Sequence, residues 1–309
     1  MLISIIIPFY DKDHNHITNM LNYLSKLSFN KEVIFIDDRN DKSLDMRSTY
    51  NIPNEYKIIN SSESGNIGTF ESRRTGTMNA TGDYIWFVDV DDMPLDFDAS
   101  VVDGKKELYY FNAIHYDVTT NTRKTQLELN DICPNYISKY YHEFTEKEGN
   151  LITFHISNKS EKFVGYVFRY LFYSISFCVW DKLFKTNILR EMYDSTEVLK
   201  NFSYGEDSFL VRLYLKHLVF KYKGFDLQIS TSPNYIYYEY IFEKYNFKKR
   251  YEHFSKEKIM YTLEISKKFF KNTWLEIFTY LSEDDSEIER KQGSSTFNIK
   301  HNYAYSIIE

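Results

Sequence analysis

The first 90 residues of the chain alternate between two hydrophobic patterns. Strand-like runs rich in apolar and β-branched residues lie at 2–8, 33–37, 56–60 and 84–88, and a continuous run of this kind is typical of a strand covered on both faces. Between the first two runs, apolar residues recur at helical spacing over 17–27. Strands that alternate with helices predict βαβ units, and therefore an α/β fold with a mostly parallel central sheet flanked by helices.

The remaining elements follow from the same patterns. A helix is predicted at 69–80, and Gly82 stands where a glycine commonly caps a helix C-terminus. The less regular second half predicts strands at 108–116 and 234–240, helices at 163–173, 181–192 and 207–216, and a helical segment from about 241.

Composition narrows the class of protein. The 309 residues suit one large α/β domain, or such a domain with an extension. An apolar fraction of 43% excludes a mostly disordered chain, and 10 Gly and 5 Pro exclude collagen-like and low-complexity sequences. Cys133 and Cys178 are too few for a disulfide scaffold, the N-terminus lacks a signal-peptide pattern, and the stretch 163–180 is too polar for a membrane span. We therefore expect a cytoplasmic protein.

Two of the predicted strands are followed by clusters of acidic residues. Asp37 and Asp38 end the second strand, and Asp89, Asp91 and Asp92 follow the fourth. Ligands of such sheets bind beyond the carboxyl ends of the strands, so both clusters are expected at one edge. Oxygen ligands suit Mg²⁺ or Mn²⁺, which leave coordination positions open for phosphate oxygens. The second cluster therefore indicates a metal–diphosphate site, with a surface acidic loop or a Ca²⁺ site as alternatives.

A wider set of motifs surrounds these acidic clusters. They are Ser4–Asp11 (SIIIPFYD), Val33–Asp38 (VIFIDD), the stretch from Gly65 to Asp92, and Trp180–Phe184 (WDKLF) followed by Tyr204–Asp207 (YGED). Together they resemble the signature of the family 2 glycosyltransferases, in the family's order and with its typical spacing. The resemblance covers residues 3 to about 240.

The resemblance implies a GT-A type fold and an inverting sugar transfer from a nucleoside-diphosphate sugar, with a UDP-sugar as the expected donor. Mn²⁺ or Mg²⁺ would neutralise the leaving diphosphate. Residues 1–100 would form the nucleotide-sugar-binding half and residues 101–240 the acceptor-binding half. Residues 241–309 would form a helical C-terminal extension.

Roles for single residues follow from the same resemblance. Donor-binding residues are implied at Pro8, Phe9, Tyr10, Asp11, Asp38, Asn66, Gly68, Arg73 and Asp89. Asp38 would accept a hydrogen bond from a base N–H, and Arg73 would offset diphosphate charge. Asp89 would contact the ribose or the metal, and Asp91 would bind the metal.

The acceptor side needs a base that deprotonates the acceptor hydroxyl. The resemblance makes Asp207 the candidate, with its neighbour Glu206 as the alternative. Both acids would also favour a helix N-terminus without any catalytic role. Trp180 would line the acceptor site or simply be a buried aromatic residue. Lys182 would contact the acceptor, pair with a carboxylate or remain a solvated charge.

Some positions depart from the family pattern. Arg74 stands where the family usually has Asn, and the Asp37-Asp38 motif lacks the common Gly-Ser after it. These departures leave the nucleotide open. The Gln-x-x-Arg-Trp motif of processive polysaccharide synthases is absent from the sequence, so one sugar per encounter is expected.

The formal net charge of the chain is -6, but one segment is strongly basic. Residues 241–275 carry nine Lys or Arg and four Glu, a net charge of +5. This segment is either a solvated helical face or a contact with an anionic acceptor, a membrane surface to which the protein would be peripheral, or nucleic acid. The expected acceptor is a glycan, a lipid-linked glycan or another surface polymer.

Three other functions remain as alternatives. They are a glycosyltransferase acting on nucleic-acid bases, an inactive carbohydrate-binding relative, and a nucleotidyltransferase of similar fold. The last would need a Gly-rich basic loop after the first strand, where this chain has Phe9–Asp13.

Overall fold

The computed structural model describes residues 1–10, 14–41, 43, 45–63, 66–117, 121–125, 145–148, 151–157, 178–200, 202, 206–222, 224–239, 261, 264–265 and 268–269. The chain divides into two compact units, 1–247 and 248–309. Asp11, Cys133, the predicted helix at 163–173 and nearly all of the basic segment lie outside the described residues. The boundaries predicted near 100 and 240 stay predictions.

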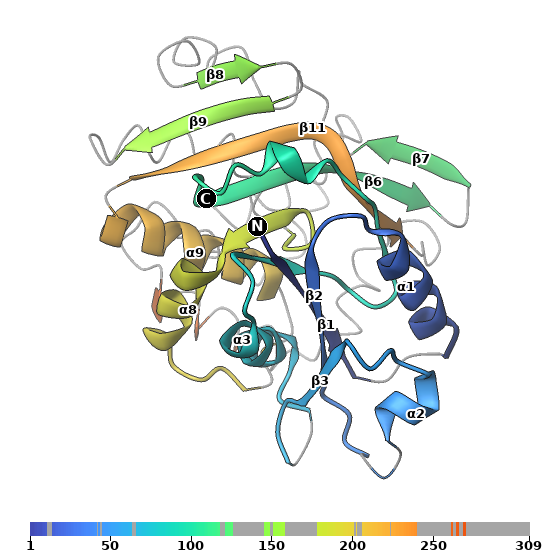
Figure 1. Ribbon diagram of the computed structural model, residues 1–309. Helices are drawn as coiled ribbons and strands as arrows, with labels where there is room; N and C mark the ends of the chain where they lie inside the picture. The colour runs from blue at the N-terminus through green and yellow to red at the C-terminus, as the bar shows by residue number, and fades with distance from the viewer. Residues whose placement is uncertain are drawn as a thin grey trace, which may run out of the picture. The chain divides into compact units, whose positions relative to one another are not determined.

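The first four strands form the parallel part of the sheet, as the hydrophobic pattern predicts. β1 (Ile3–Phe9) pairs with β2 (Lys31–Asp37) on one side and with β4 (Tyr84–Phe87) on the other, and β3 (Lys57–Asn60) pairs with β2. All these pairings are parallel, so the carboxyl ends of β1, β2 and β4 meet at one edge (Figure 1). The acidic clusters that follow β2 and β4 therefore share that edge.

The second half of the chain extends the same sheet with mixed pairings. β10 (Lys182–Lys185) lies antiparallel between β4 and β6 (Leu108–Asp117), and the long β11 (Gly224–Glu239) runs parallel to β6. The shorter strands are β5 (Met93–Pro94), β7 (Thr122–Thr125), β8 (Thr145–Glu148) and β9 (Leu151–Ser157). The order β3-β2-β1-β4-β10-β6-β11-β9-β8 makes one curled sheet.

Helices cover both faces of this sheet. α1 (His14–Lys26) and the short α2 (Met46–Tyr50) lie on one face, where alternate β1 side chains and the buried face of α1 share a core. α3 (Thr69–Asn79), α8 (Thr186–Asp194) and α9 (Glu206–Tyr222) lie on the other (Figure 1). A short 3₁₀ turn spans Ala99–Val101. α3 and α9 thereby bring their first turns to the carboxyl edge of the sheet.

The predicted helix at 181–192 is wrong in its first part. Residues 182–185 form β10, and the helix α8 begins only at Thr186. Lys182, Leu183 and Phe184 are all buried because they sit between two strands, with β4 and β6 as hydrogen-bonding partners. A four-residue strand is too short to show a clear alternation of apolar and polar residues. The helical spacing of the residues that follow therefore determined the prediction for the whole stretch.

Gly82 does not cap α3, contrary to the prediction. The helix ends at Asn79, and its C-terminal cap is Ala80 in an extended conformation. The glycine is instead required by close packing, since a Cβ at this position would lie 2.7 Å from the Ser4 backbone nitrogen. Gly82 N–H also donates to the Ser4 hydroxyl at 2.8 Å.

Glu32 joins three segments at the amino edge of the sheet. Its carboxylate accepts hydrogen bonds from Ser4 Oγ at 2.5 Å and Thr81 N at 2.7 Å, and it pairs with Lys57. Burial alone would raise the pKa of this carboxyl, but the donors from Lys57, Ser4 and Thr81 outweigh it and hold the pKa at about 2. The carboxylate therefore stabilises the fold above the pKa of an unfolded glutamate, and this stabilisation is lost as the pH falls from about 4.5 toward 2.

We expect Glu32→Gln to lower the free energy of unfolding by about 1–2 kcal/mol at pH 7, because the charge-assisted hydrogen bonds are lost at a partly solvated site. The difference between wild type and variant should shrink as the pH is lowered from 4.5. Urea unfolding at pH 7 and pH 3.5 measures both values. An equal difference at the two pH values would show that ionisation of Glu32 is not the source of the stability.

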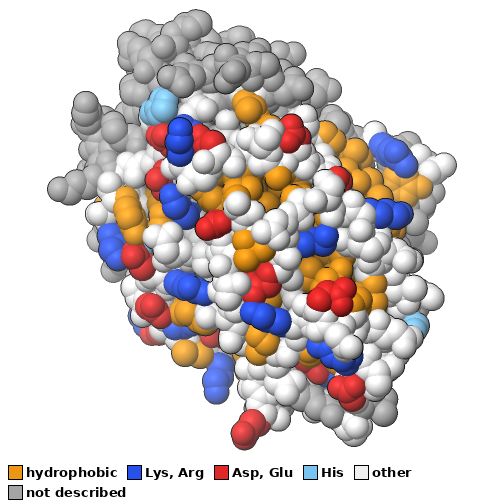
Figure 2. Space-filling view, viewed as in Figure 1, with side chains coloured by type: hydrophobic (Ala, Val, Ile, Leu, Met, Phe, Trp, Pro, Cys, Tyr) orange, Lys and Arg blue, Asp and Glu red, His pale blue; other side chains and the backbone are white. Residues whose placement is uncertain are grey.

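On the face shown in Figure 2, acidic and basic side chains alternate rather than gathering into a region of one sign. Among the described residues, no helix is long and apolar enough to cross a membrane.

Candidate active site

The chain turns sharply at the carboxyl end of β4. Val88 N–H still follows the strand and donates to Ile6 O at 3.1 Å, and Asp92 N–H then closes a turn on Asp89 O at 3.1 Å. We call residues Asp89–Asp92 the acidic turn. Asp92 is buried, whereas the Asp89 side chain is 33% exposed and opens toward the first turns of α3 and α9. The turn thus presents carboxylates of different accessibility at the sheet edge.

Arg73 is the centre of charge beside this turn. Its side chain is 1% exposed and projects from α3 between the acidic turn and the start of α9. The guanidinium pairs with Asp207, lies 3.2 Å from Asp89 Oδ1 and 3.8 Å from Glu206 Oε1, and packs over the Phe87 ring. One buried cation therefore holds three carboxylates that come from two distant parts of the sequence. The role implied by the resemblance, offsetting diphosphate charge, stays a prediction.

The pKa values of two of these acids are raised. Burial is the largest cause of the raised pKa of Asp89, with repulsion from Asp207 and Asp91 adding to it and Arg73 opposing it. Burial and the neighbouring Asp207 likewise raise the pKa of Glu206 against the effect of Arg73. Burial alone would lower the pKa of the Arg73 guanidinium. The three carboxylates outweigh this effect and raise the pKa, so Arg73 stays charged. Such crowding of carboxylates is typical of functional sites.

The residues predicted to bind the nucleotide lie beside this cluster. Asp38 N–H donates to Phe9 O at 2.7 Å, and Asn66 N–H donates to Asp38 O at 2.9 Å, so the ends of β1 and β2 and the start of α3 meet. The Asp38 carboxylate accepts from the backbone of Ile67 and Gly68 at 2.9 and 3.1 Å. Gly68 has a φ of 91°, which explains the glycine at this N-cap.

Solvent exposure differs among the three predicted nucleotide-binding residues at the end of β1, which are Pro8, Phe9 and Tyr10. The Phe9 side chain is fully buried and packs edge-on against Tyr50, while Pro8 is half-buried. Tyr10 is 45% exposed, and its hydroxyl accepts a hydrogen bond from the Asn40 amide at 3.1 Å. Tyr10 is therefore the most accessible of the three to a ligand.

Trp180 and Lys182 are both buried in this structure. The Lys182 ammonium is 0% exposed, lies 2.5 Å from Asp181 Oδ1 and donates to Cys178 O at 2.6 Å. Burial raises the pKa of Asp181 despite this lysine. The Trp180 ring stacks on the Tyr235 ring with centroids 4.7 Å apart. The contacts of Trp180 and Lys182 in this structure are therefore with neighbouring protein groups. Their contact with the acceptor stays a prediction.

Tyr235 is the residue that the motifs did not indicate. Its hydroxyl donates to Asp92 Oδ2 at 2.9 Å and accepts from Asp89 N–H at 3.1 Å, so it touches both ends of the acidic turn. The sequence contains 28 tyrosines, and nothing in their spacing distinguishes this one. Only the pairing of β11 with β5, which follows the acidic turn directly, reveals it.

Among the residues that the structure describes, no group of three or more His, Cys, Asp or Glu side chains is arranged to bind a metal ion. Asp89 and Asp91 still offer two carboxylates on one turn. Magnesium in nucleotide sites is commonly held by one or two carboxylates together with substrate phosphates. The donor set therefore fits a metal that arrives with a diphosphate.

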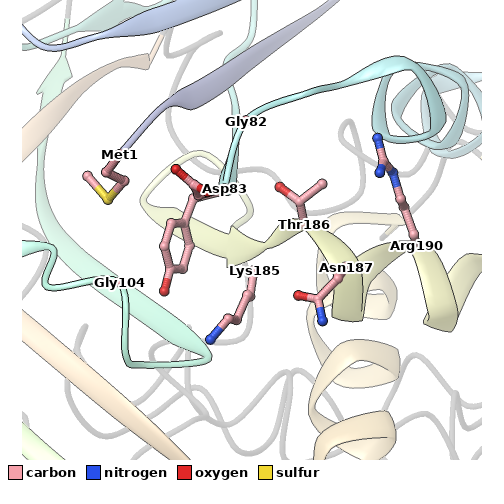
Figure 3. Close-up of a pocket in the computed structure, with 9 residues that line it drawn as sticks. Met1, Gly82, Asp83, Gly104, Lys185, Thr186, Asn187 and Arg190 are labelled. Atoms are coloured by element: carbon pink, nitrogen blue, oxygen red, sulfur yellow. The ribbon is translucent and has the colours of Figure 1, made fainter.

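A separate cavity of about 450 Å³ lies at the opposite edge of the sheet (Figure 3). It is formed where β4 begins, near Asp83, and where α8 begins, near Thr186. Arg190 lines it, but its guanidinium is hydrogen-bonded to the Thr77 and Ala80 carbonyls. None of the predicted site residues lines this cavity.

Comparison with known proteins identifies a matching family and similar folds. The family described as Glycosyl transferase family 2 matches residues 4–171. A search of curated proteins gives no match. The matched range includes the acidic turn and Arg73 but ends before Glu206 and Asp207.

Solved structures of S. aureus TarS are similar in fold. TarS 1–349 gives a TM-score of 0.52 at 18% identity, covering 88% of this chain and 66% of that one. TarS 1–349 in complex with UDP-GlcNAc gives 0.53 at 17%, covering 88% and 67%, and the complex with UDP gives 0.50 at 16%, covering 94% and 78%. The chain thus spans about two thirds of the first two. The predicted GT-A type α/β fold is confirmed.

Proposed function

The chain belongs to glycosyl transferase family 2, a family of glycosyltransferases, and on that premise we propose that it transfers a sugar from a nucleoside-diphosphate sugar to an acceptor hydroxyl. We propose a UDP-sugar as donor, inversion at the transferred carbon and one sugar per encounter. The similar fold of TarS, whose structures contain UDP-GlcNAc or UDP, supports the choice of donor.

The meeting of the acidic turn with Glu206 and Asp207 around Arg73 carries this proposal. The acidic turn lies at the same carboxyl edge of the sheet as Asp38 and Asn66, where a nucleotide would bind. Asp207 and Glu206 begin α9, 134 and 133 positions beyond Arg73 in the sequence, yet both lie within 4 Å of its guanidinium. Donor-side and acceptor-side carboxylates are therefore neighbours, as a direct transfer requires.

Asp207 is the proposed general base, with Glu206 as the alternative. The base must be ionised to take the proton of the acceptor hydroxyl. Asp207 lies against the Arg73 guanidinium, which holds its carboxylate at the start of α9. The raised pKa of Glu206 favours its protonated form instead. These environments distinguish the two neighbours.

Mn²⁺ or Mg²⁺ is the proposed cofactor, held by Asp91 and Asp89. When bound, the metal would neutralise charge on the diphosphate leaving group. Asp38 and Asn66 would position the nucleoside, and Tyr10 would pack beside it. Arg73 would hold Asp89 and Asp207 on one guanidinium.

The acceptor and the location are proposed from chemistry alone. We propose a glycan, a lipid-linked glycan or another surface polymer as acceptor, and a cytoplasmic enzyme that contacts an anionic surface through residues 241–275. That segment carries a net charge of +5, which would attract an anionic acceptor or membrane.

A binding experiment tests the proposal. Isothermal titration of UDP, GDP and CDP, with Mn²⁺ and with a chelator, should show one preferred nucleotide for wild type. Asp91→Asn should weaken binding of that nucleotide in Mn²⁺ roughly tenfold or more, because a charge-assisted contact contributes about 1.5–3 kcal/mol.

The control variant is Asp98→Asn. Asp98 is exposed and accepts a hydrogen bond from Ser100 N–H at the N-cap of the 3₁₀ turn, outside the acidic turn. It should bind the nucleotide as wild type does. Wild type that binds no nucleotide would overturn the proposed function. Binding without release of nucleotide from any nucleotide-sugar would favour the inactive carbohydrate-binding relative.

A further inference from the structure

We propose that Tyr235 is a positioning residue that sets the shape of the acidic turn and thereby the affinity for the donor. Tyr235 lies on β11, more than 140 positions beyond the turn that it touches. This inference rests on the proposed function, because it assigns the donor diphosphate to the acidic turn. It concerns how that turn is held, which the family resemblance leaves unstated.

The hydroxyl of Tyr235 bonds both ends of the turn at once. It accepts from Asp89 N–H at 3.1 Å and donates to Asp92 Oδ2 at 2.9 Å. The turn's own hydrogen bond, from Asp92 N–H to Asp89 O, measures 3.1 Å. The hydroxyl therefore links Asp89 and Asp92 a second time, in addition to the hydrogen bond of the turn itself. Asp91 lies between these two linked residues.

Asp92 is committed to this closure. Its side chain is 4% exposed, and a buried carboxylate needs hydrogen-bond donors to offset its lost hydration. The Tyr235 hydroxyl supplies one of them. Asp92 therefore anchors the turn from its buried end, whereas the Asp89 side chain at the other end is 33% exposed.

The ring of Tyr235 is itself held in place. It is fully buried, stacks on Trp180 at 4.7 Å with an interplanar angle of 12°, and meets the Trp86 ring edge-on at 6.3 Å. Trp86 Nε1 in turn donates to Trp180 O. The backbone is fixed as well, since Tyr235 pairs with Pro94 of β5, and Leu95 N–H donates to Asn234 O at 2.7 Å.

These contacts give the hydroxyl a defined position relative to the sheet. The acidic turn begins at the end of β4 and ends at β5, and β5 is paired to β11 at Tyr235. Because these contacts hold the ring, we expect the hydroxyl to keep the turn in one geometry before a ligand binds. Such preorganisation lowers the cost of binding.

The test is Tyr235→Phe, which keeps the ring and removes only the hydroxyl. We expect binding of the nucleotide that wild type prefers, measured with Mn²⁺ by isothermal titration, to weaken about tenfold or more, as is typical when a residue that orients ligands is lost. The KM for the nucleotide-sugar should rise, with a smaller change in kcat. The Asp89 amide should also exchange its hydrogen faster, because its acceptor is gone.

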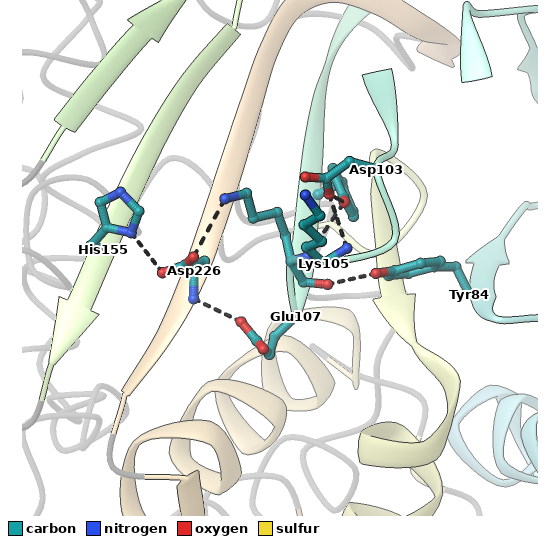
Figure 4. Close-up of polar contacts among 8 residues, drawn as sticks. Tyr84, Asp103, Lys105, Glu107, His155 and Asp226 are labelled. Atoms are coloured by element: carbon teal, nitrogen blue, oxygen red, sulfur yellow. Dashed lines mark hydrogen bonds and ion pairs between the residues drawn. The ribbon is translucent and has the colours of Figure 1, made fainter. Parts of the chain in front are cut away.

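Two matched controls remove the hydroxyl from an equally buried tyrosine side chain elsewhere. Tyr84→Phe loses a hydrogen bond to Lys106 O of 2.7 Å, at the far end of β4 (Figure 4). Tyr214→Phe loses the bond of 2.7 Å that the hydroxyl donates to Glu107 O and the bond of 3.1 Å that it accepts from Lys185 N–H. Both should lose thermal stability to a similar degree as Tyr235→Phe and should bind the nucleotide like wild type.

The outcomes separate this inference from the proposed function. If wild type binds the nucleotide and Tyr235→Phe behaves like the two controls, the positioning role is wrong and the proposed function stands. If wild type binds none of UDP, GDP and CDP, the proposed function falls and this inference falls with it. Should Tyr235→Phe fail to fold, Asp92→Asn, which weakens the same hydrogen bond, must lower nucleotide affinity about threefold, and unchanged affinity overturns the proposal.

Discussion

Arg73→Met is expected to lower the free energy of unfolding by about 3 kcal/mol at pH 7, or to prevent folding altogether. Arg73 is the cation that the structure places among Asp89, Glu206 and Asp207. Without it, these carboxylates face one another in a partly desolvated site, and each loses a charge-assisted partner. Urea unfolding of wild type and variant measures the difference.

The pH dependence identifies the cause. In the variant the loss of this cation raises the pKa values of Asp89 and Glu206 further above those of the unfolded chain, so the destabilisation is greatest at neutral pH. As the pH falls toward 5 the acids take up protons, the repulsion disappears, and the difference from wild type should shrink. A difference that is constant between pH 7 and 5 would mean that lost packing over Phe87, not charge, explains the effect.

Two further substitutions serve as comparisons. Arg73→Lys keeps the charge but cannot bridge several carboxylates with a planar fork, so its loss should be intermediate. Arg74→Met removes a positive charge from the next position of α3, where the guanidinium lies 3.7 Å from Glu71 and donates to Glu197 O at 3.3 Å. It should cost about 1 kcal/mol. An equal loss in Arg74→Met would show that any positive charge on this helix matters alike.

The pattern of hydrophobic residues along the chain predicted the part of the site that depends on strand order, namely the acidic residues at the ends of the strands. Once Leu2–Pro8, Val33–Asp37 and Tyr84–Val88 are identified as parallel strands, the acidic residues that follow them must share an edge. The fold class followed from the same alternation, and the strands β1 to β4 are where the hydrophobic runs predicted them.

Contacts between distant segments were beyond this kind of reasoning. The ion pair of Arg73 with Asp207 depends on how α9 packs beside α3, which no periodicity encodes. Lys182 appears in the sequence as a polar position in a helical pattern, yet its burial follows from β10 lying between β4 and β6. Tyr235 is one of many tyrosines until the pairing of β5 with β11 sets it against the acidic turn.

The second large effect is expected for Asp207→Asn, which should reduce nucleotide release from the preferred nucleotide-sugar about 10²–10⁴-fold, the usual contribution of a general base. The amide still presents an oxygen to Arg73, so the fold and the binding of the nucleotide should change little. A single turnover assay gives the rate, and isothermal titration gives the nucleotide affinity of the same preparation.

Glu206→Gln is the matched control, because it removes the neighbouring carboxylate of the same helix turn. Burial and the neighbouring Asp207 raise the pKa of Glu206, which disfavours the ionised form that a base needs, so its loss should reduce the rate far less. A severe loss in Glu206→Gln with a near-normal Asp207→Asn would exchange the two roles. Normal rates in both variants would contradict a base at the start of α9, and would leave Arg73 holding these acids for stability alone.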